Sequence, residues 1–235
     1  MAENGLTASV RKVVPQNADL KGFKGFTLAE VLITLVIVGV IASMTIPTLM
    51  NNTNKQEYVS RLIKTYSTLN QGLNAIWNNN DTAPGDYTMF HTVNYLDEFE
   101  KVGSIQKKCN TIQACIGVSI ATRYKTLKNS VFASLTDGKT VITSDGQLIS
   151  YVIVTSSASV YLSAENQAKT IGRFFVDVNG EKGPNKLGVD AYYLYLVEGK
   201  GVVPSGMDGV TYCNTNNYGQ DCAAKVLKEK AITYI

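Results

Sequence analysis

The residue with the most unusual chemical setting is Glu30, a carboxylate at the start of a long apolar stretch. No other charged residue occurs until Lys55. Carrying a charged side chain to the centre of a bilayer costs about 2.5–3.5 kcal/mol, and residues that bear this cost are usually functional. A cation would stabilise Glu30, and the amine of a newly formed N-terminus is a cation. Glu30 is therefore a candidate for such an ion pair.

A second candidate site lies late in the chain, where oxygen-bearing side chains alternate with glycines. Asp177, Asn179, Glu181 and Asp190 would allow the chain to wrap around Ca²⁺, which takes about 6–8 oxygen ligands. The spacing departs from that of an EF-hand after the first three positions. The alternative is a turn rich in Gly and Asn, in which Asp177 and Asp190 accept backbone hydrogen bonds. We favour the turn over a structural calcium site.

The four cysteines and the single histidine restrict the remaining chemistry. Neither close pair of cysteines has Cys-x-x-Cys spacing, which disfavours zinc. If this region lies outside the cytoplasm, disulfides are permitted. Of the three possible connectivities we expect the local one, Cys109 with Cys115 and Cys213 with Cys222. His91 alone excludes schemes that need two histidines, and the chain has no glycine-rich nucleotide loop. We therefore expect a protein that is not an enzyme.

Composition and charge narrow the class of protein further. The chain has 235 residues, of which 45% are hydrophobic and 17% are charged, with a net charge of +3. The low charged share excludes a disordered polyelectrolyte. The net charge is too small for a general nucleic-acid coat, and no basic stripe with interleaved aromatics is present. We predict no nucleic-acid partner.

The N-terminal part has the pattern of a membrane segment. The uncharged residues from Val31, with Phe26–Ala29 in front, reach the roughly 20 residues that a helix needs to cross a bilayer. Basic residues precede them, at Arg11, Lys12, Lys21 and Lys24, which predicts an N-in, C-out orientation. A cleaved secretory signal peptide and a plain signal anchor are the alternatives. Neither explains Glu30.

The stretch Lys-Gly-Phe-Thr-Leu-Ala-Glu-Val-Leu-Ile over residues 24–33 resembles the processing site of type IV pilins and type II secretion pseudopilins. The resemblance implies cleavage after Gly25 by a membrane aspartyl protease, the prepilin peptidase, which then N-methylates Phe26. It makes Glu30 the fifth residue of the mature chain, and Pro47 stands where the family often has a helix-loosening proline. The leader is long for a type IVa pilin. The close resemblance covers about residues 22–75.

Assembly through the apolar helix follows from its composition. Packing many such helices into a bundle keeps apolar surface from water, at roughly 25 cal/mol per Å². In a bundle, Glu30 would pair with the amine of Phe26 in a neighbouring subunit and set the axial register. The alternative is that Glu30 only caps the helix, where a carboxylate favours the dipole. Pro47 is a plausible place for a kink, the alternative being a harmless bend.

The elements expected after the apolar stretch form an α+β fold. The helix should continue to about Trp77, because apolar residues recur along one stripe at steps of three and four. The turn-forming residues 78–86 end it. A short helix is expected over 95–102, a last helix and strand over 223–235, and strands over 140–143, 147–155, 173–178 and 191–197. These would give a mainly antiparallel four-stranded sheet packed on the second half of the helix, as in pilins.

We therefore expect three parts: a cytoplasmic leader over 1–25, a transmembrane and assembly helix over 26–54, and a soluble extracytoplasmic domain over 55–235. The chain would sit in the inner membrane before joining a pilus or pseudopilus. Its partners would be copies of itself or related subunits, the prepilin peptidase, the inner-membrane assembly machinery and membrane lipid. The alternatives are a minor pilin-like module that binds a secreted protein, DNA or a surface, and a plain membrane-anchored domain.

Overall fold

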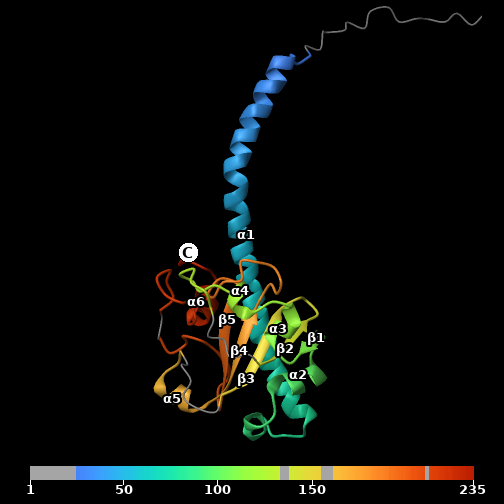
Figure 1. The fold of residues 1–235 in the computed structure, drawn as a ribbon, viewed down its shortest axis with the longest axis vertical. Helices are drawn as coiled ribbons and strands as arrows, with labels where there is room; N and C mark the ends of the chain where they lie inside the picture. Colours follow the sequence, from blue (N-terminus) through green and yellow to red (C-terminus); the bar gives the residue numbers. More distant parts are fainter. Residues whose placement is uncertain (1–24, 133–137, 155–160, 210–211) are drawn as a thin grey trace, which may run out of the picture. The chain divides into compact units, whose positions relative to one another are not determined.

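The computed structural model describes residues 25–132, 138–154, 161–209 and 212–235 (Figure 1). The chain divides into two compact units, Met1–Thr48 and Leu49–Ile235, and we call the second unit the head. The boundary expected between residues 54 and 55 stays a prediction. Of the expected leader, all but Gly25 lies outside the described residues.

One long helix, α1 (Leu28–Asn79), contributes to both units. Its first part consists of aliphatic residues and its second part has one apolar face. It ends at Asn79, where Asp81 takes a left-handed backbone conformation with φ of 50°. The helix expected from Phe26 to about Trp77 is confirmed, with small differences at its ends.

The described residues of the head form a six-stranded antiparallel sheet whose strands follow chain order. Its hydrogen-bonded neighbours are all antiparallel, and the strands are β1 (Ile105–Cys109), β2 (Lys139–Thr143), β3 (Leu148–Ile153), β4 (Thr170–Asp177), β5 (Ala191–Val197) and β6 (Gly201–Pro204). The expectation of four strands was wrong, because it missed the two edges. β1 is too polar and β6 too short to show a strand pattern in the sequence.

Both faces of this sheet are buried, as the alternation along β5 shows. Tyr192, Leu194 and Leu196 belong to the core that the sheet shares with α1. Tyr193 and Tyr195 point into a second core on the opposite face, together with Tyr124 and Phe175. All these tyrosines are at most 1% exposed. The head is therefore three-layered, with α1 on one face and the loops and short helices around 112–132 on the other.

The helical segments between the strands are short. They are the 3₁₀ helix η1 (Thr88–His91) and the helices α2 (Tyr95–Val102), α3 (Ile112–Ile116), α4 (Ile120–Arg123), α5 (Ala164–Ala168) and α6 (Cys222–Glu229). The expected helix over 95–102 is α2, with identical bounds. The tail contains α6, but no strand follows Glu229 in this described part of the chain. That part of the expectation was wrong.

Two residues of α1 lie differently from the expected amphipathic pattern. Ile63, which the spacing placed on the apolar stripe, is 37% exposed, whereas the neighbouring Leu62 is fully buried. Asn70, expected on the polar face, instead meets the edge strand β6. Its Oδ1 accepts from the backbone N–H of Val202 (3.0 Å), and its Nδ2 donates to the Val202 carbonyl (3.2 Å). Asn70 thus supplies the pairing that a seventh strand would give.

Candidate assembly segment

The start of α1 is closed by a reciprocal pair of hydrogen bonds between Thr27 and Glu30. The Glu30 carboxylate oxygen Oε2 accepts from both the backbone N–H and the hydroxyl of Thr27, each at 2.8 Å. In return the Thr27 hydroxyl oxygen accepts from the backbone N–H of Glu30 at 3.2 Å. This is a capping box, a Thr-x-x-Glu pattern that satisfies free N–H groups at a helix start. A cap by Glu30 was one of the alternatives expected from the sequence, but the part played by Thr27 was not expected.

Only one oxygen of Glu30 is used in this arrangement. Its other carboxylate oxygen, Oε1, forms no hydrogen bond with any residue over the described ranges. Glu30 is exposed, as are Gly25 and Phe26 before it. The cap and an additional ion pair are therefore compatible, because Oε1 is free to accept from a cation.

The first part of α1 presents apolar side chains on every side. Its large apolar side chains are 44–81% exposed, and they are Leu28, Val31, Leu32, Ile33, Leu35, Val36, Ile37, Val38, Val40, Ile41, Met44, Ile46, Leu49 and Met50. Phe26, just before the helix, is 87% exposed. By length and composition, α1 could cross a membrane: its most apolar 18-residue window has a mean hydropathy of 2.3, with no residue buried. A soluble protein rarely exposes so large an apolar surface, which marks an interaction site.

The polar groups within this apolar segment are satisfied locally. The hydroxyls of Thr34, Ser43 and Thr45 donate to backbone carbonyls three or four residues earlier, at 2.7–3.1 Å. Such bonds remove the penalty of a free hydroxyl in an apolar environment. Pro47 lies inside α1 and has no N–H, so the carbonyl one turn earlier lacks its helical donor.

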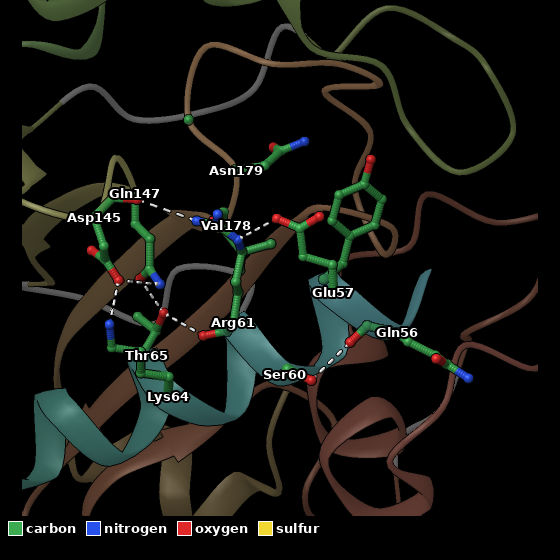
Figure 2. Close-up of polar contacts among 12 residues, drawn as sticks. Gln56, Glu57, Ser60, Arg61, Lys64, Thr65, Asp145, Gln147, Val178 and Asn179 are labelled. Atoms are coloured by element: carbon green, nitrogen blue, oxygen red, sulfur yellow. Dashed lines mark hydrogen bonds and ion pairs between the residues drawn. The ribbon is translucent and has the colours of Figure 1, made fainter. Parts of the chain in front are cut away.

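Polar contacts fix the later part of α1 to the sheet, within the head (Figure 2). Arg61 pairs with Glu57 at 2.8 Å, and its Nη1 donates to the carbonyls of Asp145 and Val178 at 3.2 and 3.3 Å. Lys64 forms an ion pair with Asp145 at 2.7 Å. Partial burial acts to raise the pKa of Asp145, but hydrogen bonds from Lys64 and Thr143 outweigh it and lower that pKa. These contacts orient α1 against the β2–β3 turn.

The oxygen-rich loop after β4 has the hydrogen bonds of a turn. Asp177 accepts from the hydroxyl of Tyr124 (2.7 Å) and from the N–H groups of Asn179 and Gly180. Asp190 accepts from the N–H groups of Asn185 and Lys186, at 2.7 and 2.6 Å. Burial, together with the nearby charge of Asp190, raises the pKa of Asp177 well above its ordinary value. Burial also raises the pKa of Asp190, to about 6.

The proposed calcium ligands do not converge as a set. Glu181 is exposed, whereas Asp177 and Asp190 are buried. No group of three or more His, Cys, Asp or Glu side chains comes together among the residues with described positions. The amide oxygen of Asn179 is buried without a hydrogen-bond partner. It is the one predicted ligand whose oxygen is both buried and free, so calcium binding stays a prediction.

The cysteines form two disulfides, Cys109–Cys115 and Cys213–Cys222, separated by 6 and 9 residues. These are the two local pairs considered from the sequence. The first joins the end of the edge strand β1 to α3. The second joins the loop before α6 to the first residue of that helix. His91, in η1, is exposed and forms no part of a cluster.

Comparison with known proteins agrees with the position of the capping box. The family described as the prokaryotic N-terminal methylation motif matches residues 20–46. The type II secretion system core protein G of Aeromonas hydrophila is 37% identical over a stretch covering 26% of this chain and 53% of that protein. The chain thus spans about half the length of this curated relative. No solved structure matches the chain significantly.

The matched stretch contains Gly25, Phe26 and Glu30 and reaches into the exposed apolar part of α1. Behind it, the chain continues into an antiparallel sheet packed on the same helix. The motif, the relative and this α+β architecture together support the place of the chain in the family of type IV pilins and type II secretion pseudopilins.

Proposed function

We propose that this chain is a prepilin-type structural subunit that polymerises through the first part of α1 into a type II secretion pseudopilus or a type IV pilus. The family consists of structural subunits rather than enzymes. It implies anchoring in the inner membrane, processing by the prepilin peptidase and self-assembly. The single observation that carries the proposal is that the first part of α1 exposes apolar side chains on every side and has one carboxylate at its start.

The apolar helix needs an environment without water in both states of the subunit. In the membrane, lipid tails cover its side chains. In the fibre, the same surfaces pack on helices of other copies, which stabilises the assembly by roughly 25 cal/mol per Å² kept from water. Gly39 and Pro47 are the places where α1 would loosen to fit such a bundle, because one lacks a side chain and the other an N–H.

Glu30 sets the axial register in this proposal. Cleavage after Gly25 creates a positively charged amine on Phe26, and Oε1 of Glu30 in a neighbouring copy accepts from it. Breaking a buried ion pair by removing one partner costs about 3–5 kcal/mol. A copy placed out of register would leave both charges unpaired in an apolar bundle, so register and ion pairing are coupled.

Processing would divide the chain as its sequence indicates. The leader, 1–25, would be removed on the cytoplasmic side by the prepilin peptidase, and 26–54 would form the membrane and assembly helix. The domain 55–235 would lie outside the cytoplasm, where the two disulfides can form. The inner-membrane assembly machinery would then extract the subunit into the fibre.

Glu30→Gln tests the register role, because glutamine also serves in a capping box but carries no charge. We expect the variant to be processed and to enter the membrane as the native chain does, but to be missing from sheared fibres. The matched control is Thr27→Ala, which removes the cap and keeps the charge. It should still assemble, with a helix start weakened by about 1 kcal/mol.

The opposite pattern would contradict the register role. If Glu30→Gln formed normal fibres while Thr27→Ala did not, Glu30 would act only as a cap. The intact mass of the mature native chain tests processing separately. It should equal residues 26–235 with one methyl group and two disulfides, and a chain that still begins with Met1 would overturn the proposal.

A further inference from the structure

A cluster of lysines lies at the end of the head where α1 leads back to the apolar segment. Lys55 is the first charged residue after that segment. About one helical turn later, the hydroxyl of Tyr58 donates to the carbonyl of Gly183 at 3.3 Å. This contact brings the loop between β4 and β5 beside α1, as Figure 1 shows.

Three further lysines belong to this loop or to the segment paired with it, and two of them, Lys125 and Lys186, are adjacent. Lys182 and Lys186 belong to it, and Lys125 forms a short parallel β-bridge with Lys186. The N–H of Lys125 donates to the carbonyl of Asn185 at 3.0 Å, and the Lys125 carbonyl accepts from Leu187 at 2.9 Å. We call Lys55, Lys125, Lys182 and Lys186 the basic collar.

Most of the positive charge of the collar is not balanced by neighbouring carboxylates. Lys125, Lys182 and Lys186 form no salt bridge within the described part of the chain, whereas the Lys55 ammonium donates to a main-chain oxygen of Ile235, the last residue of the sequence, at 2.9 Å. Partial burial lowers the pKa of Lys186, and the nearby charge of Lys125 lowers it further.

The acidic groups nearby do not neutralise the collar. The oxygens of Asp177 and Asp190 are buried and accept from backbone N–H groups of the loop. Glu181 is the exposed carboxylate of this loop. An anionic partner from outside the chain would therefore find several free ammonium groups.

The length of chain between the collar and the apolar segment fixes how far the collar can be from a bilayer. From Met50 to Lys55, a helix rises by about 8 Å. Charges interact over a Debye length of about 8 Å at physiological salt. With the apolar segment in the membrane, Lys55 and the loop beside it stay within reach of the headgroups.

We propose that the basic collar binds anionic phospholipid headgroups, so that the head rests on the bilayer surface before the subunit is assembled. The inference rests on the proposed function, because it requires the first part of α1 to lie in the membrane. Withdrawal from these headgroups would then be part of extracting the subunit into a fibre.

The chain contains a matched set of control lysines at the opposite end of the sheet. β4 runs from Thr170 to Asp177, which at about 3.3 Å per residue is roughly 23 Å. Lys169 immediately precedes this strand, and Lys200 lies in the turn between β5 and β6. Both are exposed, and both lie too far from the collar to share its surface.

The test uses the full-length chain in nanodiscs of phosphatidylcholine, alone or mixed with phosphatidylglycerol. A water-soluble amine-acylating reagent labels the lysines, and mass spectrometry reads each site. In the anionic discs, labelling of the collar should fall roughly fivefold, the factor expected for one lysine at an anionic surface. Labelling of Lys169 and Lys200 should not change, and high salt should remove the difference.

Two variants check that the effect comes from the collar itself. K125Q/K182Q should lose most of the remaining protection at Lys186, whereas the charge-matched K169Q/K200Q should keep it. Equal labelling of the collar in the two lipids would overturn the inference. So would protection in phosphatidylcholine that grows with the number of chains per disc, because it would identify a second copy as the partner.

The same experiment separates this inference from the proposed function. A chain that stays in the discs after a high-salt wash, yet shows no lipid-dependent protection, refutes only the headgroup contact. A chain that leaves the discs in that wash refutes the membrane segment, and with it both proposals.

Discussion

The contact between Asn70 and the edge strand β6 yields the sharpest stability prediction. Asn70 accepts from the N–H and donates to the carbonyl of Val202, a residue that is 1% exposed. Asn70→Ala leaves both backbone groups buried without partners, and each such group costs about 1–3 kcal/mol. Alanine recovers roughly 0.5 kcal/mol of helix propensity. The head should therefore lose about 1.5–5.5 kcal/mol.

Thermal unfolding of the full-length chain in detergent measures this loss. Near-ultraviolet circular dichroism reports the head specifically, because its tyrosines on β5 are buried. For a unit of this size, each kcal/mol shifts the melting temperature by roughly 2–4 °C. We expect Asn70→Ala to melt about 3–22 °C below the native chain.

The neighbouring residue provides the control. Gln71 is exposed, and its amide contacts only Ser67 one turn earlier on α1. Gln71→Ala should change stability by less than about 0.5 kcal/mol, as is usual for surface positions. Equal melting temperatures for the two variants would refute the reasoning, since they would mean that water satisfies the edge of β6 as well as Asn70 does.

Three further predictions concern the head. The pKa of Asp190 is raised to about 6 from an ordinary value of about 3.9, so the folded chain holds this proton more tightly than the unfolded chain does. The free energy of unfolding should therefore fall by roughly 2–3 kcal/mol as pH rises from 4 to 6. Asp190→Asn should flatten this slope in a pH series of melting temperatures, and an unchanged slope would contradict the prediction. Because the Asp177 and Asp190 oxygens already accept backbone N–H groups, a calcium chelator should leave the melting temperature unchanged; a rise that follows the concentration of added Ca²⁺ would instead support a metal site. Replacing both Cys213 and Cys222 by Ser should destabilise the head by about 3 kcal/mol in denaturant titrations, and a loss below about 1 kcal/mol would show that packing around α6 holds the loop without the bond.

The sequence predicted the elements with strong periodic patterns and missed those defined by neighbours. The helix α1 follows from its apolar periodicity. The strands β2–β5 follow from runs of β-branched and aromatic residues bounded by turn-forming residues. β1 has exposed residues at its centre, so it is a strand because β2 pairs with it. β6 has four residues and pairs with β5 across a tight turn. Edge strands of this kind carry too little pattern to be found alone.

The side chains on the surface of α1 also divide into those that the sequence pattern predicts and those whose role depends on neighbouring elements. The spacing of apolar residues along α1 placed Ile63 on the apolar face and Asn70 on the polar face. This reasoning assumes that the surface packed against α1 is apolar throughout. The sheet edge at β6 instead presents N–H and C=O groups, which favour an amide over an aliphatic side chain. In contrast, the Thr-x-x-Glu pattern of Thr27 and Glu30 is a local signal that could have predicted the capping box, although only the cap by Glu30 was expected.

The capping box also changes how the two roles of Glu30 relate to each other. Treated as alternatives, a cap and a register-setting ion pair compete for one carboxylate. In the structure the cap uses Oε2 alone, and Oε1 is without a partner. The cap holds the Glu30 side chain at the helix start. Its side-chain entropy is therefore lost when the helix forms, before a second subunit binds. A neighbouring amine then has only to approach Oε1, and ion pairing adds to the cap without breaking it. On this argument Thr27 is a positioning residue for assembly, and its loss should weaken fibre formation less than loss of the charge on Glu30.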